Sequence, residues 1–89
     1  MTALLDLLGR RWAMRVLWEL RDGEGTTFRE LQARCGGISS SVLNQRLREL
    51  TDAGIVATAT GYRLTSQGEQ LLDALAPIEA WAQRWNGHG

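Results

Sequence analysis

The sequence predicts a mainly α-helical (α+β) fold with one small β-hairpin, and three observations lead to this prediction. Apolar residues recur at helical spacing in five segments, which glycines or capping residues separate. Only residues 55–59 and 62–64 favour strands, and a Thr60-Gly61 turn lies between them. The 89 residues, 44% of them hydrophobic, are enough for one compact domain, which we place at residues 1–89.

Two short helices are expected at the start of the chain. Residues 3–8 are rich in leucine and are followed by Gly9, and a second helix is expected over residues 12–20. The inner face of that second helix is expected to consist of Ala13, Val16, Leu17 and Leu20. Met14 and Trp18 form a second apolar strip on it, which indicates a second packing partner.

Two further helices have clear start signals. Thr27 followed by Glu30 is a capping box for a helix over residues 28–34, which Gly36-Gly37 ends. Ser39 is placed to cap the next helix, with the preceding isoleucine packing onto its first turn. The buried faces of the two helices are expected to consist of Phe28, Leu31 and Cys35 in the first and Leu43, Leu47 and Leu50 in the second.

A long helix is expected after the hairpin. Thr65 is placed to cap a helix over residues 66–85, and Pro77 should bend it. Its apolar residues recur at spacings of three and four, which is enough for helix pairing: Leu71, Leu75, Ile78, Ala82 and Trp85.

This order of elements is typical of a winged helix-turn-helix, in which the second helix of the pair enters the major groove of DNA. We expect the helix-turn-helix over about residues 27–54, the wing over about 55–64, and dimerisation helices over about 2–8 and 66–85. The expected dimer interface comprises Leu4, Leu5, Leu8, Leu71, Leu75, Ile78, Trp81, Ala82 and Trp85.

The second helix of the pair presents side chains that suit DNA. Steps of 100° place Ser41, Gln45 and Arg48 opposite its buried face. Glutamine and asparagine pair with adenine, arginine pairs with guanine, and serine near a helix start suits a phosphate oxygen. The plainer alternative is the solvated face of a core helix, but the neighbouring elements favour DNA. The predicted contacts are Arg29, Ser39, Ser40, Ser41, Asn44, Gln45, Arg46, Arg48, Thr58, Thr60 and Arg63, with Arg46 partly structural.

The charge distribution partly answers an objection to DNA binding. The formal net charge is +0, whereas nucleic-acid-binding domains are usually basic. All ten basic residues are arginine, and residues 26–63 hold five arginines against three acidic residues. Residues 64–89 hold one arginine against three acidic residues. The positive charge therefore lies in the segment that is expected to meet DNA.

Other function classes lack their usual signals. No apolar run approaches the roughly 20 residues of a membrane span, so we expect no membrane partner. His88 is the only histidine and Cys35 the only cysteine, which predicts no metal site, no cofactor and a reducing, cytoplasmic location. No nucleophile motif or phosphate-binding glycine loop is present in the sequence, so we expect no enzyme activity.

Four tryptophans are many for a chain of this size, and packing is the default explanation. The sharper hypothesis is a pocket for a flat aromatic effector at a subunit boundary. Its predicted lining comprises Met14, Trp18, Trp81 and Trp85.

Several motifs resemble those of the bacterial HxlR-type winged helix-turn-helix regulators, which are related to the MarR-like group. They are Gly9-Arg10-Arg11-Trp12, Phe28-Arg29-Glu30-Leu31, Gly37-Ile38-Ser39, the run from Leu43 to Leu50, Ala53-Gly54-Ile55-Val56 and Tyr62-Arg63-Leu64-Thr65. The resemblance implies a DNA-binding dimer joined by its terminal helices, commonly a repressor or activator that responds to a small molecule or to redox stress.

This chain departs from the family pattern in two ways. Its wing, residues 57–63, is short, so we expect Thr58, Thr60 and Arg63 to reach phosphates rather than the minor groove. It has no cysteine near its first residue, so thiol sensing is not expected. We therefore expect a homodimeric, effector-controlled regulator on a pseudo-palindromic operator in double-stranded DNA. The alternative is a winged-helix module for protein interaction, which the zero net charge permits.

Overall fold

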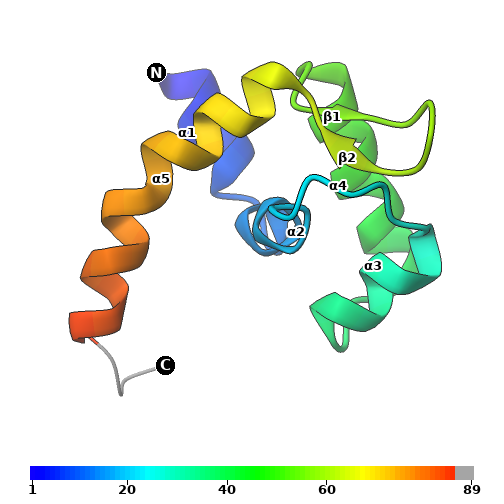
Figure 1. Ribbon diagram of the computed structural model, residues 1–89, viewed down its shortest axis with the longest axis horizontal. Helices are drawn as coiled ribbons and strands as arrows, with labels where there is room; N and C mark the ends of the chain where they lie inside the picture. Colours follow the sequence, from blue (N-terminus) through cyan, green and yellow to red (C-terminus); the bar gives the residue numbers. More distant parts are fainter. Residues whose placement is uncertain (86–89) are drawn as a thin grey trace.

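The computed structural model describes residues 1–85 and confirms a mainly α-helical fold with one small hairpin (Figure 1). In chain order, the elements are α1 (Thr2–Leu8), α2 (Ala13–Glu19), α3 (Phe28–Cys35), α4 (Ser40–Asp52), β1 (Val56–Ala57), β2 (Arg63–Leu64) and α5 (Ser66–Trp85). His88, which the sequence left without a role, lies outside the described residues.

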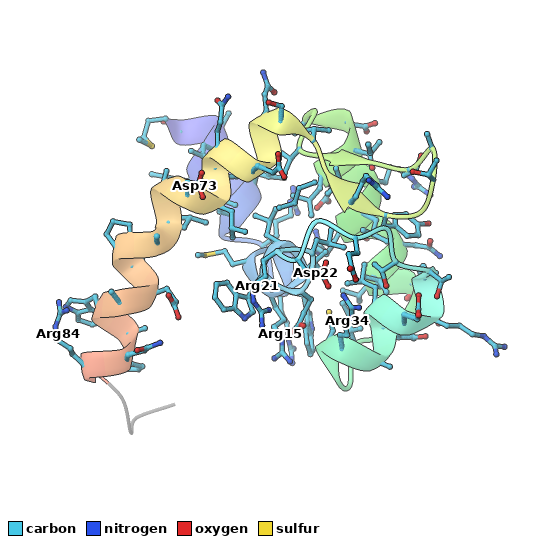
Figure 2. All side chains as sticks on the ribbon, in the orientation of Figure 1. Arg15, Arg21, Asp22, Arg34, Asp73 and Arg84 are labelled. Atoms are coloured by element: carbon cyan, nitrogen blue, oxygen red, sulfur yellow. The ribbon has the colours of Figure 1, made fainter. Side chains whose placement is uncertain are left out.

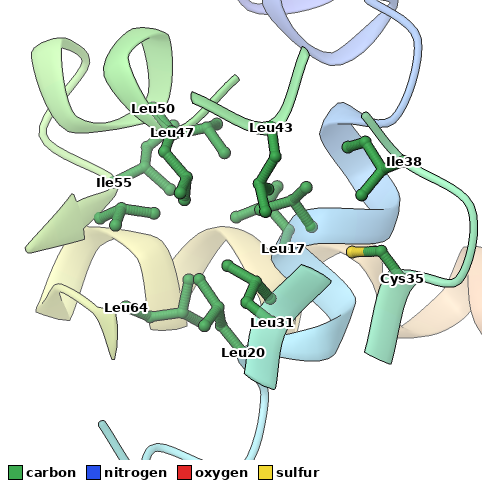
Figure 3. Packing of buried hydrophobic residues seen from close by; sticks show 12 residues of the cluster. Leu17, Leu20, Leu31, Cys35, Ile38, Leu43, Leu47, Leu50, Ile55 and Leu64 are labelled. Carbon is green, nitrogen blue, oxygen red and sulfur yellow. The ribbon is translucent and has the colours of Figure 1, made fainter. Parts of the chain in front are cut away.

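Helix α2 is the centre of the fold and contacts α1, α3, α4 and α5. Its inner face is buried as expected, because Val16, Leu17 and Leu20 have no exposed surface. Figure 3 shows Leu17 among the buried side chains of α3 and α4. Burial of each such side chain stabilises the fold by about 1.5–3 kcal/mol. The core therefore holds α3 and α4 in fixed positions against α2.

The two predicted helix starts are confirmed. Thr27 Oγ1 accepts a hydrogen bond from Glu30 N at 3.1 Å, and a Glu30 carboxylate oxygen accepts one from Thr27 N at 2.9 Å. Ser39 Oγ accepts one from Val42 N at 3.2 Å at the start of α4. These bonds satisfy backbone donors that the helices themselves leave unpaired. The boundaries of α3 and α4 therefore follow from local side chains.

Trp12 does not begin a helix, as the sequence suggested, but precedes α2 in the left-handed conformation with φ 77°. Such a backbone costs about 1–2 kcal/mol for a residue with a side chain. The short link after Gly9 must redirect the chain between α1 and α2, and the half-buried indole packs against the core. Burial of the indole offsets the strain of this turn.

The hairpin has shorter strands than expected and gains a third segment. β1 and β2 pair antiparallel with Val56 opposite Leu64. Thr26, which we had not placed in the sheet, exchanges two backbone hydrogen bonds with Tyr62 at 3.1 and 2.9 Å. Thr26 is only 2% exposed. The segment before α3 therefore anchors the hairpin, and this pairing fixes the wing relative to the helix-turn-helix.

Helix α5 begins as predicted and then leaves the body of the chain. Thr65 Oγ1 accepts a hydrogen bond from Gly68 N at 3.1 Å. Gly68 packs so closely on the residue before β1 that a Cβ there would collide with the Ile55 carbonyl oxygen. Pro77 lies inside α5, and Figure 1 shows the helix changing direction near its middle, with its C-terminal half extending outward. None of the helices within residues 1–85 is long and apolar enough to cross a membrane.

Candidate nucleic-acid interface

Helix α4 presents a polar face on the side opposite its packed face. Leu43, Leu47 and Leu50 are at most 3% exposed and hold the helix against the core. Ser41, Asn44, Gln45 and Arg48, which we call the polar face of α4, are all exposed. These four residues also line a shallow groove whose far end is formed by Glu49 and Asp52. The predicted contacts of this helix therefore share one accessible surface.

The carboxylate nearest the polar face is compensated by cations. Glu49 Oε1 forms an ion pair with Arg46 Nη1, and Glu49 Oε2 lies 3.6 Å from Arg10 Nε. Gln45 Nε2 also approaches Glu49 Oε2, at 3.5 Å. Two guanidinium groups thus face one carboxylate. The electrostatic repulsion that Glu49 would exert on a phosphate backbone is weakened accordingly.

Arg10 was not among the predicted site residues, although the sequence contains a signal for it. It belongs to the Gly9-Arg10-Arg11-Trp12 motif, on which part of the family resemblance rests. The structure shows that the α1–α2 link brings this arginine to the far end of α4, a contact across 39 positions in the sequence. No local pattern within α4 could have predicted it.

Three other predicted contacts of this helix already interact with groups of the chain itself. Ser39 is the N-cap, and Ser40 Oγ accepts a hydrogen bond from Gln32 Nε2 at 3.1 Å. The side chain of Arg46 is only 12% exposed, and its Nε has no partner among the described residues. Arg46 is thus positioned mainly to hold Glu49, in agreement with the structural part of its predicted mixed role.

Outside α4, the predicted contacts differ in accessibility. Arg29 on α3 and the wing residues Thr58 and Thr60 are exposed. Arg63 is half-buried: its Nε is buried without a partner among the described residues, and its Nη2 lies close to Gly25. The Arg63 side chain therefore lies against the segment before α3, whereas the two threonines are exposed on the wing.

A separate arginine cluster ties α2 to the end of α3 (Figure 2). Arg34 Nη1 lies 3.3 Å from Asp22 Oδ2 and donates to the Glu19 carbonyl at 3.1 Å. Arg15 Nη2 donates to the Arg34 carbonyl at 2.9 Å. The guanidinium groups of Arg15 and Arg34 therefore bind groups of the chain itself. Arg29 on α3 and Arg48 on α4 belong to no such cluster and are exposed.

The tryptophans predicted for an effector pocket do not come together. Met14 and Trp18 on α2 line a groove against α5, with a volume of about 360 Å³. Trp81 and Trp85 stack on each other, with ring centres 5.9 Å apart, and neither lines that groove. The second apolar strip of α2 does have its own partner, because it faces α5. The groove therefore contains two of the four predicted lining residues, of which only Trp18 is aromatic.

The predicted dimer residues also divide into two groups. Leu8 and Leu71 pack against the core of their own chain, and Leu4 and Leu75 are half-buried. The residues that remain exposed on α1 and α5 are Leu5, Ile78, Trp81, Ala82 and Trp85, of which Leu5 is 61% and Trp81 53% exposed. This second group is available to a partner.

Cys35 is a core residue. It is 1% exposed and packs within the buried cluster (Figure 3). Burial raises the pKa of its thiol, because the thiolate would be formed away from water.

Within residues 1–85, no group of histidine, cysteine or acidic side chains could hold a metal ion.

Comparison with known proteins finds transcriptional regulators. The sequence pattern of the family described as "HxlR-like helix-turn-helix" matches residues 7–89. The HTH-type transcriptional regulator YvaP of Bacillus subtilis is 32% identical over 91% of this chain and 82% of its own. Among solved structures, quinone-bound YodB of B. subtilis is similar, with a TM-score of 0.85 and 33% identity over 94% of this chain and 96% of that chain.

A second solved structure gives the same result. A possible HxlR family transcriptional factor from Thermoplasma volcanium has a TM-score of 0.79 and 29% identity, covering 93% of this chain and 81% of that chain. The winged helix-turn-helix arrangement expected from the order of elements is thereby confirmed.

Proposed function

Because the chain belongs to the HxlR-like helix-turn-helix family of transcriptional regulators, we propose that it binds a specific operator in double-stranded DNA as a homodimer. Regulators of this kind are not enzymes. The polar face of α4 reads the bases, and a small molecule controls the affinity.

The observation that carries the proposal is the composition of the polar face of α4. Asn44, Gln45 and Arg48 are exposed side by side, and each has a base edge that it can pair with in the major groove. The nearby Glu49 is compensated by two arginines. A face that carries base-pairing side chains beside a neutralised carboxylate suits a DNA partner.

In the proposed complex, α4 lies in the major groove with its N-terminal half toward the bases. Gln45 and Asn44 pair with adenine, Arg48 pairs with guanine, and Ser41 donates to a phosphate oxygen. Arg29, Thr58 and Thr60 contact the backbone on either side. Two copies of α4, related by a two-fold axis, enter successive major grooves about 34 Å apart.

Dimerisation is proposed through α1 and α5. Among the large apolar side chains exposed within residues 1–85, Leu5, Trp81 and Trp85 lie on these two helices. Exposed aromatic and aliphatic side chains at this density are typical of a surface that another protein covers.

The proposed control is by a non-covalent effector. YodB, which is similar in structure, has been solved with a quinone bound. In this chain the cysteine is buried and the pKa of its thiol is raised, which argues against a covalent thiol sensor. An effector that alters the angle between the two copies would alter the spacing of their α4 helices and release DNA.

The proposal is tested by the binding of the purified protein to DNA from upstream of its own coding sequence. We expect selective retardation in a gel-shift assay, relative to an unrelated duplex of equal length. Affinity should fall steeply between about 50 and 200 mM salt, because neutralised phosphates release counterions. Equal binding to both duplexes, or no binding at either salt concentration, would favour the protein-interaction module instead.

A further inference from the structure

The groove between α2 and α5 has the size and shape of a small-molecule site. Its volume of about 360 Å³ lies within the usual range for ligand pockets, about 300–1,000 Å³. Met14 and Trp18 form one wall, and α5 forms the other wall with Leu72, Leu75, Ala76, Ile78 and Ala82. An aromatic ring facing a thioether and aliphatic side chains suits a flat, apolar ligand body.

The charges in this groove have one sign. Asp73 and Glu79, both on α5, line it, and no basic side chain is among the described residues of its lining. Glu79 Oε1 accepts a hydrogen bond from Gln83 Nε2 at 2.9 Å, which is a neutral partner. Figure 2 shows Asp73 on α5. A ligand in the groove therefore meets two carboxylates beside an apolar floor.

One cation of the chain contacts the indole of Trp18. The Arg21 guanidinium carbon lies 4.2 Å from the centre of that ring, and Arg21 Nη1 donates to the Trp18 carbonyl at 3.0 Å. Arg21 does not line the groove. Arg21 thus lies over the indole in the arrangement that is usual for a cation and an aromatic ring.

We propose that the groove between α2 and α5 binds a small flat aromatic cation, such as an N-methylated bicyclic heterocycle. The ring system lies against Trp18 and Met14, and the positive charge lies toward Asp73 and Glu79. An aromatic anion is repelled by both carboxylates, and a neutral ring gains only the apolar contacts. The identification of this ligand as the effector rests on the proposed function. The proposal of a binding site in the groove does not.

A second copy of the chain is a less suitable occupant of the groove. Trp81 and Trp85 stack on each other and do not line the groove. The stacked pair Trp81 and Trp85 is therefore the apolar surface for pairing copies. A ligand in the groove would contact α2, against which α3 and α4 also pack.

The test uses three bicyclic probes of similar size that differ in charge: 1-methylquinolinium, 1,4-naphthoquinone and 1-naphthoate. Isothermal titration calorimetry on the full chain, without DNA, measures each dissociation constant. We expect the cation to bind at least tenfold more tightly than the other two. Equal or tighter binding of the quinone or the naphthoate overturns the proposal. So does the absence of binding by all three, which indicates a groove covered by the partner copy.

The matched variants replace carboxylates by amides of the same shape. The double variant Asp73→Asn/Glu79→Gln should lower the affinity for 1-methylquinolinium about tenfold or more and leave naphthoquinone binding unchanged. Glu69→Gln, on the same helix but outside the groove, is the control and should bind as the parent chain does. Cation binding that is unaltered in the double variant overturns the assignment. Failure of operator binding would leave these results unaffected, so the two proposals fail separately.

Discussion

Some side chains of α4 are packed in the core, and others are exposed to solvent. The leucines at positions 43, 47 and 50 are buried, whereas Gln45 and Arg48 are exposed and line the polar groove. Truncating an exposed side chain of this kind usually changes the free energy of unfolding by less than about 0.5 kcal/mol. Recognition can therefore be altered here without altering the fold.

The first prediction concerns these two side chains. Gln45→Ala and Arg48→Ala should each reduce the preference for operator over unrelated DNA about tenfold or more, because a bidentate base contact contributes about 1–3 kcal/mol of discrimination. Fluorescence anisotropy with both duplexes measures the effect. Gln70→Ala removes an exposed amide of α5 and should leave the preference unchanged. Undiminished preference in both α4 variants would show that this face does not read bases.

The second prediction concerns Cys35. Because burial raises the pKa of its thiol, little thiolate is present near neutral pH. Alkylation by iodoacetamide at pH 7.5 should therefore be at least 100-fold slower in the folded protein than in denaturant. Mass spectrometry of timed samples measures the rates. Fast alkylation of the folded protein would reopen the question of a thiol sensor.

Whole elements depend on local hydrogen bonds at their ends. The capping box of α3 joins Thr27 and Glu30, and the backbone bond to Thr27 is the main reason that the pKa of Glu30 lies below its ordinary value of 4.5. The hydrogen bond from the Thr27 hydroxyl and the weak one from Thr26 act in the same direction, while desolvation opposes them. The charged carboxylate is therefore the form that the helix start prefers.

The third prediction follows from the sign of that shift. A carboxylate whose pKa is lowered on folding contributes stability above its unfolded pKa, and this contribution is lost as the pH falls through the lower folded value. Glu30→Gln should therefore be less stable than the parent at pH 7, and the difference should shrink below about pH 4.5. Urea unfolding at several pH values measures it, with Glu24→Gln, in the exposed turn before α3, as control. A difference that is constant with pH would contradict the assignment.

For the molecule as a whole, the surface proposed for pairing copies and the surface proposed for DNA lie on different elements. The exposed large apolar side chains described on α1, α2 and α5 include Leu5, Ile78 and Trp81. The compensated polar face lies on α4. A chain with zero net charge can thus present one surface to DNA and another to a second copy.

The fourth prediction tests the surface proposed for pairing. Trp81→Lys should weaken the dimer at least tenfold, because a charge would be buried against apolar side chains. Operator affinity should fall with it, since a monomer holds only one half-site. Sedimentation equilibrium measures the first effect and anisotropy the second. Ala80→Lys places the same charge at a neighbouring exposed position and should leave the dimer intact. An unchanged dimer in Trp81→Lys would exclude this surface.

Much of the fold could be predicted because its signals are local. The caps at Thr27, Ser39 and Thr65 bind backbone amides within three residues, and the buried leucines of α4 follow from helical periodicity. The pairing of Thr26 with Tyr62 could not be predicted in the same way, because these two residues are 36 positions apart in the sequence. The left-handed Trp12 likewise depends on where α1 and α2 pack.

The sequence by itself determined which helix carries the polar face and which side chains that face contains, because a helix start and a period of 3.6 residues are set by near neighbours. Only the tertiary structure decided how that face is charged and where a ligand fits. Arg10 reaches Glu49 from the link between α1 and α2. Met14 and Trp18 on α2 line one groove with Asp73 and Glu79 on α5, while Trp81 and Trp85 lie outside it. Such contacts depend on the packing of distant segments against the core, and no local pattern encodes them.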